Sequence, residues 1–382
     1  MIIDLPEATT KEIGQRIIEI REDVGAMALS RVLTLVVVVD EGHAEAALTV
    51  ANQASHQHPA RIVCVILANP RGKARLDAQL RVGGDAGASE VVVLRLYGEL
   101  VRHPRSVVTP LLLPDSPIVA WWPHEPPKDP HADPVGAMAQ RRITDCAVTD
   151  NIQTTLRRLS RTYTPGDTDL AWSRITLWRG LLATTLDRAP FEPVTAATVV
   201  GGKDSPSADL LAGWLRHRLD CPVSLVRSRA GTGVVSVRLE RESGPIDLVR
   251  PRGTDTATLE QPGQPQRGIA MAPRSDAECL ADELRRLDPD EVYADALTMG
   301  WGGITRRRKT MTDAVRAGIV PSPSEAREVT EQLAEESDSS IRNAMVEAFP
   351  EEAGSDTDTV KGAARRKLAT KAARDGTDEA KE

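Results

Sequence analysis

The chain has 382 residues, of which 41% are hydrophobic and 27% are charged, and its formal net charge at neutral pH is −7. This composition is typical of a globular protein, and the length indicates two domains. The negative charge argues against a nucleic-acid-binding protein, which would present a basic surface. No apolar run approaches the ~18 residues of a membrane helix, and the N-terminus lacks the pattern of a signal peptide. We therefore expect a cytoplasmic protein that binds neither membranes nor nucleic acid.

Strands and helices are predicted to alternate over the first part of the chain. Residues 1–30 hold one helix, over about 10–24. Four apolar runs follow, each typical of a buried strand in a parallel sheet: "RVLTLVVVVD", "ARIVCVILA", "SEVVVLRLY" and "SPIVAWW". A helix is predicted over 41–59, between the first two strands. The pattern predicts a three-layer α/β domain with a mostly parallel sheet over 31–125.

A proline-rich connection, "PHEPPKDPHADP", leads into a predicted linker region over 126–160. A second domain is predicted over 161–304. Its first helix, over 170–186, has apolar residues at helical spacing, and Asp167 or Thr168 is the expected N-cap. A strand at 195–202, a helix at 205–220, three short strands separated by Gly and Pro, and a helix at 275–288 follow. This order predicts a domain that begins as α/β and continues as α+β with an antiparallel meander.

The last part of the chain, 305–382, is predicted to be a charged, flexible tail. It begins with the basic cluster "TRRRKT" and becomes acidic beyond residue 324, with few aromatic residues. Segments of this composition cannot bury enough apolar surface to fold alone. We expect this tail to be disordered in the free protein.

The cysteines and histidines lack the spacing of a metal site. The cysteines form no C-x-x-C pair, so buried, reduced thiols are expected at Cys64, Cys146, Cys221 and Cys279. A histidine site would need ligands that converge from distant segments. Exposed loop positions are the preferred interpretation of His56, His58, His124 and His131. No metal and no cofactor are therefore expected.

The stretch "SPIVAWWPHEPP" places Trp121 and Trp122 side by side in a chain that has only 6 tryptophans. Neighbouring side chains of a strand point to opposite faces. One indole is expected to fill the core, and the other to pack at the domain junction or under a partner protein. The alternative is that both indoles pack between the two domains.

The segment "VVGGKDSPSADLLAGWL" runs from a predicted strand through a glycine turn into a helix. Free amides at a helix N-terminus, with a lysine nearby, can bind a phosphate group. The candidate anion-binding residues are Gly201, Gly202, Lys203, Ser205 and Ser207. The alternative is that Ser205 only caps the helix and that the glycines form a tight turn. Neither the P-loop spacing nor G-x-G-x-x-G occurs in this segment.

No catalytic residues are predicted, because the sequence has no G-x-S-x-G or H-E-x-x-H motif and no ordered set of nucleophile and base. The segment "MGWGGITRRRK" instead favours a protein contact. It places Trp301 between glycines, beside Arg306, Arg307 and Arg308. Trp and Arg are enriched at the energetic centres of interfaces. These four residues and the tryptophan pair are the candidate partner contacts, the alternative for Trp301 being a turn that docks on its own domain.

The segments "SPIVAWWP", "LAWSRITLWRGLLA" and "ATVVGGKDSPSADLLAGWLRHRL" resemble the glucose-6-phosphate dehydrogenase assembly protein family of actinobacteria and cyanobacteria. The resemblance covers about residues 1–305. It implies a non-catalytic assembly or regulatory subunit, which binds glucose-6-phosphate dehydrogenase and promotes its assembly or active form in the oxidative pentose phosphate pathway. Cyanobacterial members are associated with a cysteine-based redox response, and the four cysteines of this chain do not match that pattern.

Two other functions stay open at the level of sequence. The turn at 201–207 could hold a sugar phosphate, either as the substrate of an enzyme or as the effector of a sensor. The acidic tail could instead recruit other proteins to a scaffold. Turnover of a sugar phosphate by the purified chain would favour an enzyme, and co-elution with the dehydrogenase would favour an assembly subunit.

Overall fold

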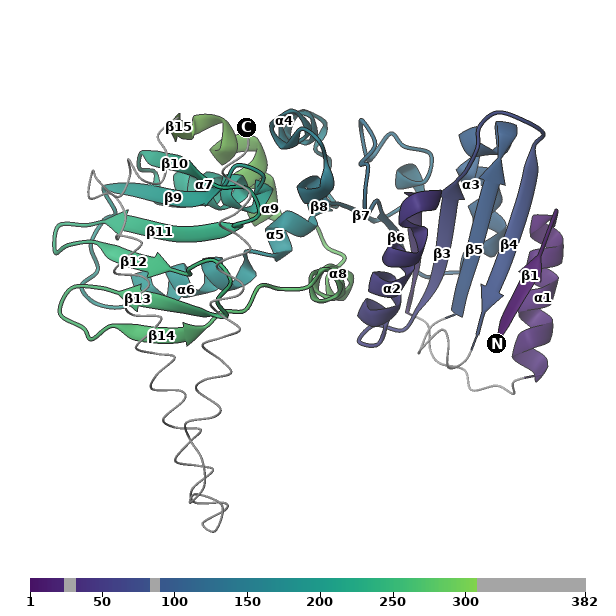
Figure 1. Cartoon of the computed structure of the whole chain (residues 1–382), viewed down its shortest axis with the longest axis horizontal. Helices are drawn as coiled ribbons and strands as arrows, with labels where there is room; N and C mark the ends of the chain where they lie inside the picture. The colour runs from purple at the N-terminus through teal and green to yellow at the C-terminus, as the bar shows by residue number, and fades with distance from the viewer. Residues whose placement is uncertain (24–31, 83–89, 308–382) are drawn as a thin grey trace, which may run out of the picture. The chain divides into compact units, whose positions relative to one another are not determined.

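The computed structural model describes residues 1–23, 32–82 and 90–307, which form two β-sheets with helices packed on them (Figure 1). The first sheet has the strand order β1-β4-β5-β3-β2-β6-β7-β8. From β5 through β3, β2, β6 and β7 to β8 all neighbours are parallel, whereas β4 is antiparallel to β1 and β5. The strands are β1 (Ile2–Leu5), β2 (Leu33–Asp40), β3 (Ala60–Leu67), β4 (Arg75–Arg81), β5 (Glu90–Tyr97), β6 (Ile118–Trp121), β7 (Arg141–Thr144) and β8 (Asp167–Asp169).

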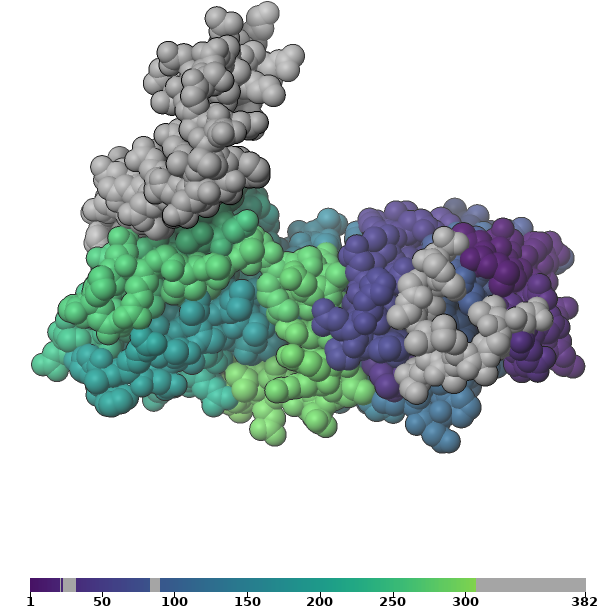
Figure 2. Space-filling model, turned by 90° about the horizontal axis from the view of Figure 1, so that it is seen from below, coloured from purple at the N-terminus to yellow at the C-terminus, as the bar shows by residue number. Residues whose placement is uncertain are grey.

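Helices cover both faces of the first sheet, because its central strands are apolar on both sides. In β2, Leu35 and Val37 pack in the layer of α2 and α8, whereas Val36 and Val38 pack in the layer of α1 and α3. Helix α8 comes late in the chain, after all strands of the second sheet except the last, yet it contacts α2 (Figures 1 and 2). These helices are α1 (Thr10–Asp23), α2 (Ala44–Ser55), α3 (Pro104–Val108) and α8 (Asp276–Arg285). The predicted three-layer α/β class is confirmed.

The structure places strand β7 of the first sheet where the sequence analysis expects a linker. This strand begins with Arg141 and Arg142, which are polar in sequence but buried in the fold. Each guanidinium has a buried acidic partner, Glu283 for Arg141 and Asp167 for Arg142. Buried charges require such partners, and partners this distant are not visible in a local pattern. Strands β1 and β4 were not predicted either, although β4 alternates polar and apolar residues as a half-buried antiparallel strand does.

The second sheet has the strand order β14-β13-β12-β11-β9-β10-β15. Strand β10 is parallel to β9 and β15, and the run from β9 to β14 is antiparallel. The expected meander is therefore present, and β13 and β14 extend it beyond the prediction. The strands are β9 (Ala196–Gly202), β10 (Val223–Ser228), β11 (Val234–Glu240), β12 (Ile246–Val249), β13 (Thr256–Glu260), β14 (Arg267–Ala270) and β15 (Thr305–Arg307).

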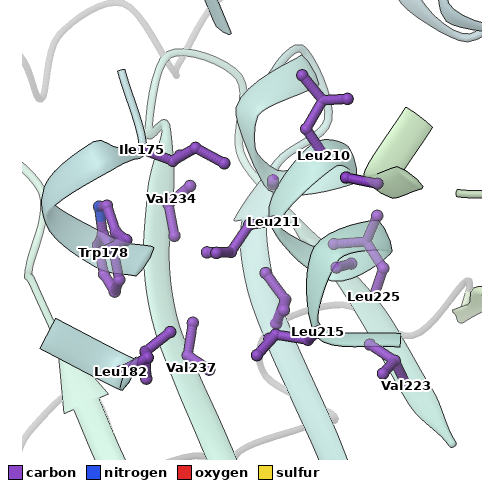
Figure 3. Packing of buried hydrophobic residues seen from close by; sticks show 14 of the residues in the cluster. Ile175, Trp178, Leu182, Leu210, Leu211, Leu215, Val223, Leu225, Val234 and Val237 are labelled. Carbon is purple, nitrogen blue, oxygen red and sulfur yellow. The ribbon is translucent and has the colours of Figure 1, made fainter. Parts of the chain in front are cut away.

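The core of the second sheet lies between its strands and two helices. Trp178 and Leu182 of α6 and Leu211 of α7 belong to one cluster with Val234 and Val237 of β11 (Figure 3). Leu215 and Leu225 extend this cluster along α7 and β10 in the same view. The helices of this part are α4 (Ile152–Thr162), α5 (Leu170–Ser173), α6 (Thr176–Leu186), α7 (Pro206–Leu219) and α9 (Glu291–Asp295), and a π-helical turn (Ala296–Gly300) follows α9.

The helix predicted over 170–186 is divided into α5 and α6. Its N-cap is Asp169, whose carboxylate accepts a hydrogen bond from the Ala171 amide at 2.9 Å. The prediction of Asp167 or Thr168 as the cap is wrong, because β8 continues to Asp169, and this last strand residue caps the helix. The chain therefore continues as a strand of the first sheet up to the residue that starts the helix.

Within the described residues, no helix is both long enough and apolar enough to cross a membrane. The tail predicted to be disordered falls mostly outside the described residues, which end at position 307. Its first three positions, 305–307, form β15 and pair with β10, so the start of the predicted tail is corrected to a strand.

Candidate functional site

Trp121 and Trp122 lie at the carboxyl end of β6 and enter opposite core layers of the first sheet. Trp121 packs in the layer of α2 and α8, and Trp122 packs in the layer of α1 and α3. Their exposed fractions are only 2% and 3%. Neither indole lies at the surface, because helices cover both faces of the sheet. Since α8 belongs to the predicted second domain, Trp121 lies where the two predicted domains meet. Contact of either indole with a partner would require a helical layer to move.

The layer that receives Trp121 is closed by α8 through a buried polar joint. Arg141 of β7 donates to Glu283 of α8 and to the carbonyl of Asp288, the latter at 2.8 Å. The other carboxylate oxygen of Glu283 accepts from the hydroxyl of Ser173, which ends α5. The joint therefore connects the first sheet to α5, which precedes the second sheet in the chain, and to α8, which follows all strands of that sheet except β15.

The two glycines that end β9 make close contacts with α7 and with the turn that leads into it. A Cβ on Gly201 would lie 2.4 Å from the Cβ of Ala208, and one on Gly202 would lie 2.6 Å from a carboxylate oxygen of Asp204. Ser205 caps α7 by accepting a hydrogen bond from the Ala208 amide at 3.3 Å. Ser205 is therefore the cap of α7, as one part of the alternative held. The glycines do not form the expected tight turn, because they belong to β9, where they allow the helix to approach the strand.

The remaining polar groups of this turn are mostly engaged. The Ser207 hydroxyl donates to the carbonyl of Ala171 at 2.8 Å. The Asp204 carboxylate accepts from the amide of Gly231 at 2.7 Å. Lys203 is exposed and brings the positive charge that the sequence analysis noted. Anion binding at 201–207 stays a prediction, and it would have to use backbone amides and Lys203 rather than the serine hydroxyls.

Arg306 is brought next to this turn, although the sequence analysis assigned it to a different site. Its Nε lies 3.7 Å from the carboxylate of Asp209, which is fully buried in the first turn of α7. Arg227 donates two bonds to the same carboxylate, at 2.8 and 2.9 Å, and one to the Gly202 carbonyl. Burial lowers the pKa of Arg306, and repulsion from Arg227 and Arg157 adds to this shift. Positive charge therefore exceeds negative charge around Asp209.

Trp301 packs on its own domain, as the alternative interpretation held. It is 7% exposed and its ring lies 4.5 Å from the guanidinium carbon of Arg306. The π-helical turn before it approaches α7 so closely that a Cβ on Gly300 would lie 1.9 Å from the carbonyl oxygen of Gly213. The neighbouring Met299 is 65% exposed. The side chain of Arg307 and all of Arg308 lie outside the part of the chain that the structure describes.

The most exposed large apolar side chain among the described residues is Phe191, at 80%. The residues on both sides of it are tied to the turn after β11. The carbonyl of Pro190 accepts from Arg241 at 3.4 Å, and the carboxylate of Glu192 accepts from the Ser243 amide at 3.0 Å. The ring is thus presented to solvent from a loop that is anchored on either side. Phe191 was not predicted from the sequence, since a lone Phe in the segment Pro190-Phe191-Glu192-Pro193 does not reveal whether its ring faces solvent.

The exposed positions of α6 have uncharged side chains, although Arg179 donates to one of them, Thr176, at 3.3 Å. The exposed Asp187 and Arg188 lie in the chain between this helix and the loop of Phe191. The exposed positions of α6 are Thr176, Leu177, Gly180, Ala183 and Thr184, which follow helical spacing. Leu177 is 43% exposed, and a Cβ on Gly180 would meet no atom within 4 Å. We call these five residues together with Phe191 the α6 surface. Uncharged exposed faces with an aromatic residue are typical of protein contacts.

The carboxyl edge of the first sheet has a topological switch point at β2. The chain leaves β2 for β3 on one side and later returns to β6 on the other. Ligands of open α/β sheets bind at such a point, and dinucleotides use a glycine-rich turn into the next helix. Here the turn is Asp40-Glu41-Gly42-His43, and Asp40 accepts a hydrogen bond from Gly42 at 2.9 Å. Carboxylates thus lie where a pyrophosphate would have to approach.

All four cysteines are free thiols in buried positions. Burial raises the pKa of Cys64 and of Cys279 to about 12. A thiol must be deprotonated and accessible to react. These positions agree with the predicted structural role of the thiols.

Two family models match the chain in succession. Residues 51–161 match the N-terminal domain of the glucose-6-phosphate dehydrogenase subunit, and residues 165–297 match the C-terminal domain of the same subunit. The two matches meet between α4 and β8 and together span more than half of the chain. A comparison with curated proteins gives no significant match.

Several solved structures are similar at low identity. An NAD-binding oxidoreductase from Klebsiella pneumoniae is 10% identical, with 72% of this chain and 96% of that chain covered and a TM-score of 0.39. UDP-N-acetylglucosamine 3-dehydrogenase from Acidithiobacillus ferrooxidans is 10% identical, with 70% and 96% covered and a TM-score of 0.36. A glucose-6-phosphate dehydrogenase in complex with glucose-6-phosphate is 8% identical, with 72% and 91% covered and a TM-score of 0.36. These scores are too low to establish a common fold.

Proposed function

The chain belongs to the glucose-6-phosphate dehydrogenase subunit family, and from this we propose that it is a non-catalytic, cytoplasmic subunit that binds glucose-6-phosphate dehydrogenase. In this proposal it promotes the assembly or the active form of the enzyme in the oxidative pentose phosphate pathway. The observation that carries the proposal is the succession of the two family domains, N-terminal then C-terminal, along one chain.

The residues at the switch point support a binding role rather than a dehydrogenase role. Asp40 caps the 3-10 turn that precedes α2, Glu41 lies in that turn, and the first turn of α2 carries Glu45. Glu41 and Glu45 are paired with Arg95 and Arg81. A helix N-terminus attracts anions only when nearby groups leave its amides and dipole available. This arrangement is unfavourable for the pyrophosphate of a nicotinamide dinucleotide.

We propose the α6 surface as the contact with the dehydrogenase. Hydrogen bonds hold the residues on both sides of Phe191, so the loop would lose little conformational entropy when a partner covers the ring. The exposed positions of α6 add area without charges that would have to be desolvated. Trp121 and Trp122, which the sequence analysis favoured, are already covered by helices of their own chain.

The experiment that tests the proposed function is co-purification from the native organism, followed by assays of the purified components. We expect the dehydrogenase to be retained with the chain, and the purified chain alone to turn over no glucose 6-phosphate. Turnover by the chain alone, at a rate that survives removal of all dehydrogenase, would show that it is an enzyme.

A sugar-phosphate effector is a second candidate, and the cluster of Arg227 and Arg306 beside the 201–207 turn favours it. The surplus of positive charge around Asp209 would attract a phosphate, which Lys203 could also reach from its exposed position. Calorimetry with glucose 6-phosphate and 6-phosphogluconate tests this. Binding that weakens in the variant Lys203→Ala, with an unchanged melting temperature, would support it. No heat at millimolar ligand would leave the turn with its capping role.

A further inference from the structure

Three side chains converge at the switch point of the first sheet. Asp40 ends β2, His43 ends the short 3-10 turn that follows, and His124 comes from the connection after β6. One ligating atom from each lies within 4.8 Å of the other two. Across residues 1–23, 32–82 and 90–307, this is the one group of three such side chains that could share a metal ion.

Strand register explains why these residues meet. Val37 of β2 is paired in parallel with Trp121 of β6. Asp40 and His124 each lie three residues beyond this pair. Because the two strands are parallel neighbours, both residues lie at the same distance past the pair, at the carboxyl edge of the sheet. The burial of Trp121 and Trp122 on opposite faces fixes the end of β6, which in turn holds the position of His124. The register of β2 with β6, rather than the conformation of a single loop, therefore brings Asp40 and His124 together.

The distances suit a divalent transition ion. His43 Nδ1 lies 2.8 Å from each carboxylate oxygen of Asp40, and His124 Nδ1 lies 3.5 Å from one of them. Zinc–ligand bonds of about 2.0–2.1 Å at tetrahedral angles place neighbouring donor atoms about 3.3 Å apart. Among the described residues, His124 Nδ1 has no hydrogen-bond partner although the atom is buried. It is therefore a buried nitrogen that an ion could use.

The two imidazole rings are stacked, with centroids 3.6 Å apart and an angle of 17° between their planes. An ion binds in the plane of an imidazole ring, so the rings would have to tilt apart to share one. Both side chains are partly exposed, at 49% for His43 and 32% for His124, so solvent leaves room for this tilt. Binding of an ion would therefore rotate the two imidazoles out of their stacked arrangement.

We propose that Asp40, His43 and His124 bind one divalent transition-metal ion, with Zn²⁺ as the best fit to two imidazoles and one carboxylate. Three protein ligands leave at least one coordination position for water or for a group of a partner molecule. The site is separate from the α6 surface, and the proposal does not depend on the proposed function.

Isothermal titration calorimetry of the untagged full-length chain with ZnCl₂ tests the site, and Co²⁺ absorption reports its geometry. The variants are His43→Gln, His124→Gln and Asp40→Asn. The matched control is His103→Gln, because His103 is an exposed histidine whose Nε2 lies 3.6 Å from Glu99. The metal-free melting temperature of each variant shows whether it is folded.

We expect one Zn²⁺ per chain, at least about tenfold weaker binding in every folded ligand variant, and unchanged binding in the control. Bound Co²⁺ should show the intense visible bands of a four-coordinate site. The proposal is overturned if the wild-type chain binds no Zn²⁺. It is also overturned if the ligand variants bind with the same stoichiometry and affinity, since the metal would then sit on other surface groups.

Discussion

Arg141 in β7 donates from its guanidinium to the carboxylate of Glu283 in α8, although 142 positions separate the two residues in sequence. Their side chains are only 4% and 7% exposed. The pair connects the parallel sheet to a helix that the chain reaches only after all strands of the second sheet except β15. We therefore expect this ion pair to hold α8 in its position against α2 and over Trp121.

Replacing Glu283 by Gln should destabilise the chain by about 3 kcal/mol, because it leaves the buried charge of Arg141 without its counter-charge. The free energy of unfolding in urea measures this effect. The matched control is Glu291→Gln, which removes an exposed carboxylate from the neighbouring helix α9 and should change stability little. Equal, small effects of the two substitutions would show that the buried pair does not hold α8.

Replacing either Trp121 or Trp122 by Ala should cost about 3–5 kcal/mol of stability through the cavity that remains. The sequence alone favoured a division, with one indole acting in stability and the other in binding. Burial of both rings predicts instead that both variants melt early. Affinity for the dehydrogenase, corrected for the folded fraction, should stay unchanged. A variant that melts normally but loses affinity would restore the interface role of that indole.

The pH dependence of stability should carry a contribution from Asp247 in β12. Burial raises the pKa of this carboxyl from its usual 3.8 to about 6, with help from Glu260 and Glu240, although Arg238 opposes the shift. The folded state thus holds the proton up to a higher pH than the unfolded state. The stabilisation linked to this proton is fully present below about pH 4 and is lost as the pH rises through about 6.

Urea unfolding of the wild type and of Asp247→Asn across this pH range isolates the effect. The variant cannot titrate at this position, so the stability of the wild type relative to the variant should fall from pH 4 to pH 6. A difference that stays constant over this range would show that the folded chain does not raise this pKa.

The α6 surface makes a prediction about binding. Phe191→Ser should weaken binding of the dehydrogenase by roughly thirtyfold, corresponding to about 2 kcal/mol for an interface anchor. Its melting temperature should not fall, because the ring is 80% exposed. Surface plasmon resonance on the immobilised dehydrogenase measures the dissociation constant. Retained affinity would place the contact elsewhere, with Met299 as the next exposed apolar residue.

A pair of glycines offers a matched test of the same surface. Gly180→Lys adds a charge and a long side chain to the outer face of α6, and Gly14→Lys makes the same change on α1. A Cβ meets no atom within 4 Å at either position, so both variants should fold. Only Gly180→Lys should reduce binding. Equal binding by both variants would exclude the middle of α6 from the interface.

The fold could be predicted where the physical signal is local. The run that forms β2 is apolar and β-branched throughout, which is typical of a strand covered on both faces. The candidate site could not be predicted in the same way. Burial of Arg141 depends on Glu283, exposure of Phe191 depends on a turn near Ser243, and the approach of His124 to Asp40 depends on the register of β2 with β6. Each of these relationships joins segments that are distant in sequence.

The proposed function rests on the family membership, and the residues alone left several functions open. The glycine turn at 201–207 looked like an anion site, yet its serine hydroxyls are used within the fold. The paired tryptophans looked like an interface, yet they fill two core layers. In both cases a local pattern has a structural role that only the packing reveals.

The most direct measurement of the central claim is size-exclusion chromatography with light scattering on a mixture of the chain and the dehydrogenase from the same organism. We predict a peak whose mass exceeds that of either component, whose fractions contain both chains, and whose dehydrogenase is in its assembled, active form. Two separate peaks at the masses of the free proteins, with dehydrogenase assembly and activity unaffected by the chain, would contradict the claim.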